Sequence, residues 1–168
     1  MKIPSLLRLL AVLLTGCLAP QTLADSTPAN DTASPGSQIQ ATQSDDYQGI
    51  YALVLKMVDA WNAHDLDGYL SVFWNSPDLV VIVEGEQAKG WAELSANYHR
   101  GFTDLTQMGS VITDRVQIQT VSPGIALVVD WWTLVFTTRK ISGTSTFVVR
   151  NLPEGWRIVA GHTTILAS

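Results

Sequence analysis

The feature that most restricts the fold is the segment from Ile125 to Phe136, because both of its alternating faces are apolar. A strand in an antiparallel sheet with one face in water alternates polar and apolar residues. A strand that is apolar on both faces must instead be covered on both sides. We expect one face to pack on helices and the other on a second subunit, which predicts a homodimer formed through the sheet.

The first half of the domain is predicted to be mainly helical. Asp45 and Gln48 form a capping-box pattern, and apolar residues then recur at helical spacing as far as Trp61. The predicted elements of this half are a helix over 45–63, a second over 66–73, a strand over 79–84, a turn and short connection over 85–90, and a third helix over 91–102.

The second half is predicted to be β-structure, because β-branched and apolar residues alternate in long runs between turn signals. We predict strands over 111–121, 125–138, 144–150 and 156–166, with turns at 122–124, 142–143 and 151–155. Helices followed by a meander of strands indicate an α+β fold, with the helices on one face of an antiparallel sheet.

The first residues have the layout of a secretory signal peptide. Basic Lys2 and Arg8 precede an apolar run over 9–14. A helix needs about 20 apolar residues to cross a bilayer, so this run is too short to span one. Cleavage after Ala24 would remove residues 1–24. The segment 14–17 also resembles a bacterial lipobox, in which case residues 1–16 are removed and Cys17 is lipidated. We therefore expect an exported, periplasmic protein, either soluble or anchored to the envelope through Cys17.

The remaining chain divides into two parts by composition. Residues 25–44 are rich in Ser, Thr, Pro, Asn, Gln and Ala, so we predict a disordered linker there and an ordered domain over 45–168. The formal net charge is −5 and no block of Lys or Arg occurs, which disfavours a nucleic-acid partner. Cys17 is the only cysteine, so no intramolecular disulfide can form.

Four segments occur in a recognisable order. They are Ala60 to Asp67, Val80 to Val83 with Lys89-Gly90-Trp91, Gly143 with Thr146 to Val149, and Gly155 to Val159 leading to His162-Thr163-Thr164. Together they resemble the nuclear transport factor 2-like superfamily, in its SnoaL-like and ketosteroid-isomerase-like branch, over about Tyr47 to Leu166.

This resemblance implies a cone-shaped, cystatin-like fold. In it, three N-terminal helices pack on a strongly curved antiparallel sheet and leave an apolar pocket open at one end. Dimers formed through the sheet are common among such proteins. The superfamily includes enzymes, small-molecule binders and association domains, so the fold alone does not settle the function.

Asp130 is the acidic residue most suggestive of chemistry, because it stands between Val129 and Trp131 in the apolar strand. A carboxyl group desolvated there has a raised pKa, which suits a general acid or base, or a neutral hydrogen-bond donor. In a strand Asp130 shares a face with Trp132. Two positions remain open: Asp130 faces a pocket, or it lies at the rim of a subunit interface.

His162, on the last predicted strand, is the second candidate for catalysis. Alternation puts it on the same side as Ile158 and Ala160, from where it could exchange a proton with Asp130. It could equally be a histidine that is hydrogen-bonded to backbone and closes the cone. The resemblance to SnoaL-type cyclases implies the first role, since those enzymes pair an Asp with a His.

A pocket of this kind needs apolar walls and a few polar groups. Glu84, at the end of the first predicted strand, is expected near the mouth of the cone, where it would orient a ligand or simply face water. Together with Trp132, aromatic residues of the helical half are expected to line or fill the pocket; they are Tyr51, Trp61, Tyr69, Trp74, Tyr98 and Phe102.

These residues leave three functions open. The first is binding of a small, largely apolar molecule in the pocket. The second is cofactor-independent isomerase, cyclase or hydro-lyase activity that uses Asp130 and His162. The third is a non-catalytic dimerisation module whose pocket is filled by its own side chains. The sequence contains no pattern typical of metal ligands, of a Ser or Cys nucleophile or of a phosphate-binding loop, so neither a metal nor a cofactor is expected.

Overall fold

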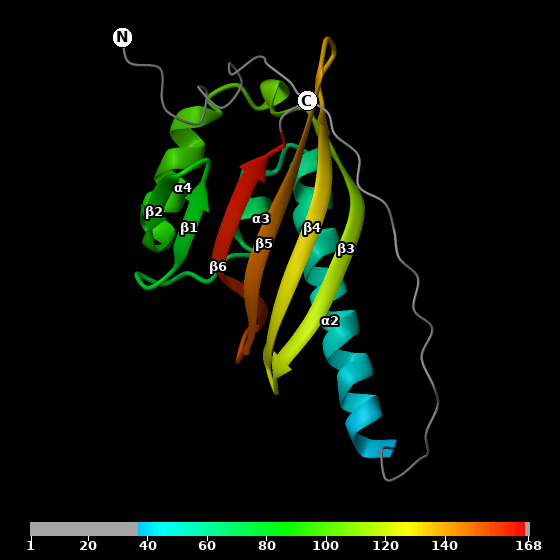
Figure 1. Cartoon of the computed structure of the whole chain (residues 1–168). Helices are drawn as coiled ribbons and strands as arrows, with labels where there is room; N and C mark the ends of the chain where they lie inside the picture. Colours follow the sequence, from blue (N-terminus) through cyan, green and yellow to red (C-terminus); the bar gives the residue numbers. More distant parts are fainter. Residues whose placement is uncertain (1–36, 167–168) are drawn as a thin grey trace.

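The computed structural model describes residues 37–166, with side chains from residue 45 onward (Figure 1). The predicted signal peptide, Cys17 and residues 25–36 of the predicted linker lie outside the described residues. Within the described part, helices pack on one face of a six-stranded sheet, so the predicted α+β class is confirmed. No helix among these residues combines the length and apolar character needed to cross a membrane.

The elements follow one another largely as predicted. They are helix α2 (Ser37–Asn62), helix α3 (Leu66–Leu70), strands β1 (Val80–Val83) and β2 (Glu86–Lys89), helix α4 (Gly90–Gly101), the 3₁₀ helix η1 (Leu105–Met108), and strands β3 (Ser110–Ser122), β4 (Ile125–Val135), β5 (Lys140–Leu152) and β6 (Gly155–Ile165). The long strands β3 to β6 form a meander in which each strand pairs with the next.

The strand order in the sheet is β2-β1-β6-β5-β4-β3. Neighbouring strands are antiparallel except for β1 and β6, which run parallel. The sheet is therefore mixed, whereas the sequence pattern predicts a wholly antiparallel one. Strands β1 and β6 are separated by most of the domain in the sequence. No short turn joins them, so they are free to pair in parallel.

Helix α2 packs an apolar face on the sheet. Ile50, Val54 and Met57 recur at helical spacing and are buried. The helix begins at Ser37 and takes in the last part of the predicted linker. Asp45 therefore lies inside the helix and not at its N-cap, so the predicted capping box is not formed.

The side chain of Asn62 connects the end of α2 to the sheet through two hydrogen bonds. Asn62 Nδ2 donates to the carbonyl oxygen of Val111 over 3.0 Å, and the Val111 N–H donates to Asn62 Oδ1 over 2.7 Å. The side-chain amide thus pairs with the edge strand β3 through both a donor and an acceptor. This holds the last turn of α2, which carries Trp61, beside the start of β3.

Strand β1 lies where a strand is predicted, whereas β2 lies where the sequence pattern predicts only a turn and a short connection. Val83 pairs with Glu86, so Glu84 and Gly85 form a two-residue loop, with φ angles of +49° and +83°. Positive φ at both positions is the requirement of a type I′ turn. Glutamate is unusual at the first of them, so the hairpin has no clear sequence signal.

The turn between β4 and β5 lies earlier than predicted. Ser142 and Gly143 belong to β5, and the chain reverses between Phe136 and Arg139, where the Phe136 N–H donates to the Arg139 carbonyl oxygen over 2.9 Å. Residues 137 and 138 are both threonine. Without Gly, Pro or Asn, this reversal carries a weak local signal.

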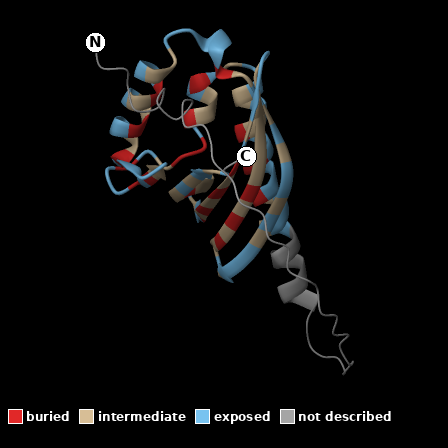
Figure 2. Cartoon of the chain, turned by 45° about the horizontal axis from the view of Figure 1, so that its top comes forward, coloured by how far each residue is buried: buried red, intermediate tan, exposed pale blue. Residues whose placement is uncertain are grey.

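The core lies between the helices and one face of the sheet, called here the inner face (Figure 2). A β-bulge in β6 changes which residues face inward. Val148 pairs with Ala160 and Val149 with Ile158, so Val159 is an extra residue in β6. Ile158 faces inward with Val149, and both are buried. Ala160 faces outward with Val148.

Candidate functional site

A cavity of about 150 Å³ lies between the inner face of the sheet and the helices. Side chains from helices α2, α3 and α4 and from strands β1, β3, β4, β5 and β6 line it. Most of the wall is apolar, and its aliphatic and phenylalanine side chains include Met57, Val58, Val83, Val111, Leu134 and Phe147.

Among the described residues that line this cavity, Asp130 is the only acidic one. It lies in β4 opposite Val116 of β3 and Ser145 of β5, and only 3% of it is exposed. Of the two positions that the sequence leaves open, Asp130 occupies the one in the pocket. Trp132 lines the same cavity, as the alternation of the strand predicts.

The Asp130 carboxyl group lacks full compensation for its burial. Its Oδ1 has no hydrogen-bond partner among the described residues. Burial raises the pKa of Asp130 to about 6; the nearby Thr113 hydroxyl lowers it, and the Asp114 carboxylate raises it further. Thr113 Oγ1 itself forms no hydrogen bond of good geometry within the described part of the chain, so its contribution is weak. Burial therefore dominates.

Two hydroxyl residues continue a polar row from Asp130 across the sheet. Ser145 pairs with Asp130 in the register of β4 and β5, and Thr163 pairs with Ser145 in that of β5 and β6. The Trp132 Nε1–H donates to Ser145 Oγ over 2.9 Å, and the Ser145 and Thr163 hydroxyls are 2.9 Å apart in a hydrogen bond. Neither Ser145 nor Thr163 is among the pocket residues predicted from the sequence, because only the strand register brings them to the cavity.

Two tyrosines face the polar row from the helices. The hydroxyl groups of Tyr69 on α3 and Tyr98 on α4 are 3.2 Å apart in a hydrogen bond. Burial raises the pKa of both phenols. For Tyr69, the neighbouring Tyr98 and the charge of Asp130 raise the pKa further, so both hydroxyls are protonated at neutral pH. One of them donates to the other, which leaves one proton free to donate elsewhere.

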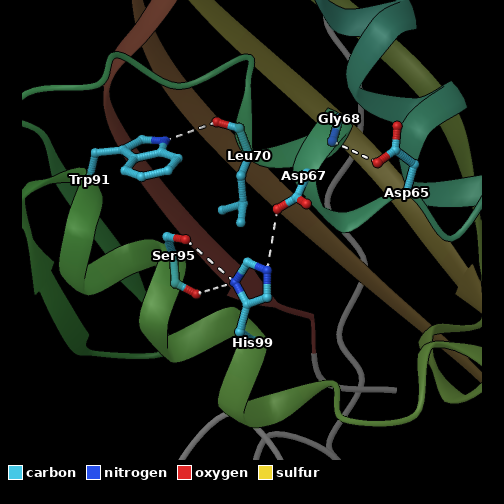
Figure 3. A network of polar contacts seen from close by, with 7 residues as sticks. All are labelled: Asp65, Asp67, Gly68, Leu70, Trp91, Ser95 and His99. Carbon is cyan, nitrogen blue, oxygen red and sulfur yellow. Dashed lines mark hydrogen bonds and ion pairs between the residues drawn. The ribbon is translucent and has the colours of Figure 1, made fainter.

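Two polar contacts, one exposed and one partly buried, hold α3 against α4 and so position the two tyrosines (Figure 3). His99 Nε2 on α4 lies 3.3 Å from the Asp67 carboxylate on α3. The Trp91 Nε1–H on α4 donates to the Leu70 carbonyl oxygen over 3.2 Å. Leu70 directly follows Tyr69, and His99 directly follows Tyr98, so the two contacts help to fix the spacing of the phenols.

Further aromatic rings complete the wall of the cavity. Trp61 on α2 packs edge-to-face with Tyr69 at 5.1 Å between ring centres and with Phe102 at 5.5 Å. Trp61 Nε1 is buried and has no hydrogen-bond partner among the described residues. Trp61, Tyr69, Tyr98, Phe102 and Trp132 are all predicted pocket residues, and all five line the cavity.

His162 lies on the opposite face of the sheet from Asp130. It is exposed, whereas its neighbour Thr163 lines the cavity. The prediction that His162 shares a face with Ile158 is wrong, because the bulge at Val159 shifts the alternation by one residue. The structure therefore does not bring His162 to Asp130, and the predicted pair is not formed.

Three further residues of the predicted pocket do not line this cavity. Tyr51 is on the exposed side of α2, where its ring stacks on that of Tyr47. Trp74 follows α3, and its N–H donates to the backbone of β6 over 2.9 Å. Glu84 stands in the β1–β2 loop, and its carboxylate accepts a hydrogen bond from the Ile165 N–H. Their positions follow from local turns and helix faces that hydrophobic spacing alone does not resolve.

Gly143 makes room for one wall of the cavity. It pairs with Trp132 in the register of β4 and β5, and a Cβ atom on Gly143 would lie 2.1 Å from the Trp132 ring. Only glycine lets the indole lie flat across β5, where its Nε1–H reaches Ser145. No group of three or more His, Cys, Asp and Glu within the described residues is arranged to hold a metal ion.

Solved structures of several bacterial proteins have a similar fold. A protein of unknown function from Shewanella oneidensis MR-1, described as NTF-2 like, is 29% identical, with a TM-score of 0.66 over 72% of this chain and 98% of its own. An NTF2-like superfamily protein from Salmonella enterica is 22% identical, with a TM-score of 0.63 over 75% of this chain and 94% of its own. A cystatin-like domain of unknown function from Nostoc punctiforme is 24% identical, with a TM-score of 0.62 over 74% and 79%.

These similarities concern structure. No protein-family model matches the sequence, and no curated protein does. The residues of the cavity itself are therefore the basis for its chemistry.

Replacing Asp130 by Asn should stabilise the domain at alkaline pH. Folding raises the pKa of Asp130 from 3.8 to about 6, so the folded chain holds an extra proton between these values and stability falls as the pH rises through them. Above pH 6 the full cost of the buried charge is present. At pH 8 we expect D130N to be more stable by about 2–3 kcal/mol, and at pH 4 by less than about 1 kcal/mol. Urea denaturation at the two pH values measures both differences.

Asp114→Asn is the matched control, because it removes an exposed carboxylate from the neighbouring strand. Its effect on stability should be well below that of D130N at pH 8, because the Asp114 carboxylate makes only a small contribution to the raised pKa of Asp130. An effect of D130N that is the same at pH 4 and pH 8 would contradict the raised pKa.

Proposed function

We propose that this chain, a member of the nuclear transport factor 2-like superfamily, holds a small, largely apolar molecule between the sheet and the helices. The polar end of this molecule contacts Asp130. The observation that carries the proposal is the unpartnered Oδ1 of Asp130 in a cavity whose other walls are mainly apolar. A few polar groups in an apolar cavity are typical of small-molecule sites.

The volume of the cavity restricts the ligand. About 150 Å³ corresponds to roughly one aromatic ring with few substituents. The proposed ligand is therefore small, and a single polar contact is enough to orient it. The space is open and not filled by the protein's own side chains, which does not favour the alternative of a dimerisation module with a plugged pocket.

Filling the cavity from β6 should weaken the binding of a small probe. Thr163→Phe adds a ring among the residues that line the cavity, whereas Thr164→Phe adds the same ring at the next residue, which is exposed. We expect wild type and T164F to bind benzyl alcohol alike, and T163F to bind it about tenfold or more weakly. Ligand-observed NMR titration of the three proteins measures the affinities, with circular dichroism to confirm folding. Undiminished binding to folded T163F would reject the cavity as the site.

A second function is favoured by the electrostatics of Asp130. A pKa of about 6 lies near neutral pH, which suits a group that accepts and returns a proton during a reaction. Tyr69 and Tyr98 line the same cavity, and whichever hydroxyl accepts the hydrogen bond between them can donate its own proton to an oxygen on which negative charge develops. The alternative is a cofactor-independent isomerase in which Asp130 is the base and His162 has no part.

If Asp130 is such a base, the protein should accelerate exchange of the α-protons of a small ketone, for which cyclohexanone in D₂O is a suitable probe. Proton NMR follows the exchange. We expect D130N to lose the acceleration by about 100-fold or more, since general bases typically contribute this much, and D114N to keep it. A wild-type rate no greater than that of buffer would reject the alternative and leave the binding proposal intact.

We also propose that two copies associate through the outer face of the sheet. Leu127, Val129 and Trp131 of β4 and Val148 of β5 alternate with the inward-facing residues and are half-buried. The Arg115 guanidinium lies 3.6 Å from the ring centre of Trp131 and covers part of it. An apolar sheet face of this extent favours association, and a second copy of the chain is the simplest cover.

Sedimentation velocity at micromolar concentration should then report a dimer. Val129→Glu places a charge at the centre of the outer face and should weaken association by about tenfold or more. Leu55→Glu makes the same kind of change at an exposed leucine on α2 and should leave the dimer intact. A wild-type monomer at this concentration would reject the proposed dimer.

A further inference from the structure

We propose that the cavity selects a small organic cation, a protonated amine on a compact apolar body, whose charge pairs with the Asp130 carboxylate. This inference rests on the proposed binding function and adds the chemical class of the ligand. Three features of the site support it: the balance of charge, the aromatic wall and the hydrogen bonds of the neighbouring hydroxyl groups.

The charge around the cavity is one-sided. Asp130 is an acid, and within the described part of the chain no Lys, Arg or His lines the cavity. Arg115, close to Asp130 in the register of β3 and β4, lies instead over the Trp131 ring on the outer face. A buried carboxylate without a counter-charge is costly, and a cation brought by the ligand offsets that cost.

The aromatic wall suits a cation as well as an apolar body. Trp61 meets Tyr69 at an angle of 70° and Phe102 at 87°, so ring faces point in different directions around the cavity. Trp132 adds a fourth ring from the sheet. The faces of Trp and Tyr attract a cation within about 6 Å of the ring centre, and they do so more strongly when water is excluded. The wall therefore favours an ammonium group over a carboxylate.

The hydroxyl groups beside Asp130 do not take the place of a counter-ion. Ser145 bonds to Trp132 Nε1 and to Thr163, which leaves Asp130 Oδ1 without a partner among the described residues. Trp61 Nε1 is a second buried atom without a partner. The Trp61 N–H can donate to an oxygen of a charged or a neutral ligand alike. Only the Asp130 carboxyl group therefore determines which ligand charge the cavity prefers.

The pH dependence of binding follows from the groups that face Asp130. The Tyr69 phenol from α3 and, through it, the Tyr98 phenol from α4 lie in the same cavity, and the exposed Asp114 carboxylate of β3 acts on Asp130 through its charge. None of them is cationic. As the pH falls through about 6, Asp130 takes up a proton while a simple amine stays charged, so the preference for the amine should decline.

Three benzene derivatives of matched size test the inference on the full chain. They are benzylamine, benzyl alcohol and benzoate, which are cationic, neutral and anionic at about pH 8. We expect benzylamine to bind about tenfold or more tightly than benzyl alcohol, and benzoate to bind more weakly than either. In D130N the preference for the amine should vanish while benzyl alcohol still binds. D114N should keep the preference. Ligand-observed NMR titration at about pH 8 and pH 5 gives the affinities, and the preference should fall by about tenfold at the lower pH.

The outcomes separate this inference from the function on which it rests. Equal affinity for benzyl alcohol and benzylamine would overturn the cation selectivity and leave the binding proposal standing. No binding of either compound would reject both. A preference for benzylamine that persists in D130N would assign it to the net negative charge of the chain, which is −5, and would overturn the role of Asp130.

Discussion

The burial of one carboxyl group in an apolar cavity is the constraint on which the rest of the site depends. Asp130 stands in the middle of β4, which pairs along its length with β3 and β5. Its side chain therefore turns outward only if the strand shifts by a residue, and such a shift would also expose Val128, which is fully buried. The hydrophobic packing of β4 thus holds a charged group where its own solvation energy disfavours it.

The same strand shows how much of the site the sequence can predict. Alternation puts Asp130 and Trp132 on one face, and both line the cavity. The choice of face cannot be predicted locally, because Leu127 and Val129 make the other side equally apolar. The face on which Asp130 lies depends on which side of the sheet the helices cover. That is determined by residues far from β4 in the sequence. The order of helices and strands, by contrast, follows from local periodicity and was predicted well.

Other parts of the site depend on single departures from regular geometry. One extra residue, Val159, reverses the alternation of β6, so that Thr163 faces the cavity and His162 does not. No Gly or Pro marks this bulge in the sequence. The β1–β2 hairpin likewise depends on a glutamate, Glu84, with positive φ. Ser145 lies beside Asp130 only because β4 pairs with β5 in this register. Residue type and spacing along the chain therefore do not predict that it lines the cavity.

Asp130 is the group that folding alone does not explain. Ser145 and Thr163 satisfy each other, and the two phenols do the same, whereas Asp130 Oδ1 has no partner among the described residues and its burial opposes stability. Natural sequences depart from such rules mainly where function requires it. A weakly screened carboxylate in an apolar cavity exerts a strong field on whatever enters. That field attracts an ammonium group, and it equally draws a proton from an acidic C–H bond. Binding and proton transfer are therefore two uses of one arrangement, and the groups that the ligand carries decide between them.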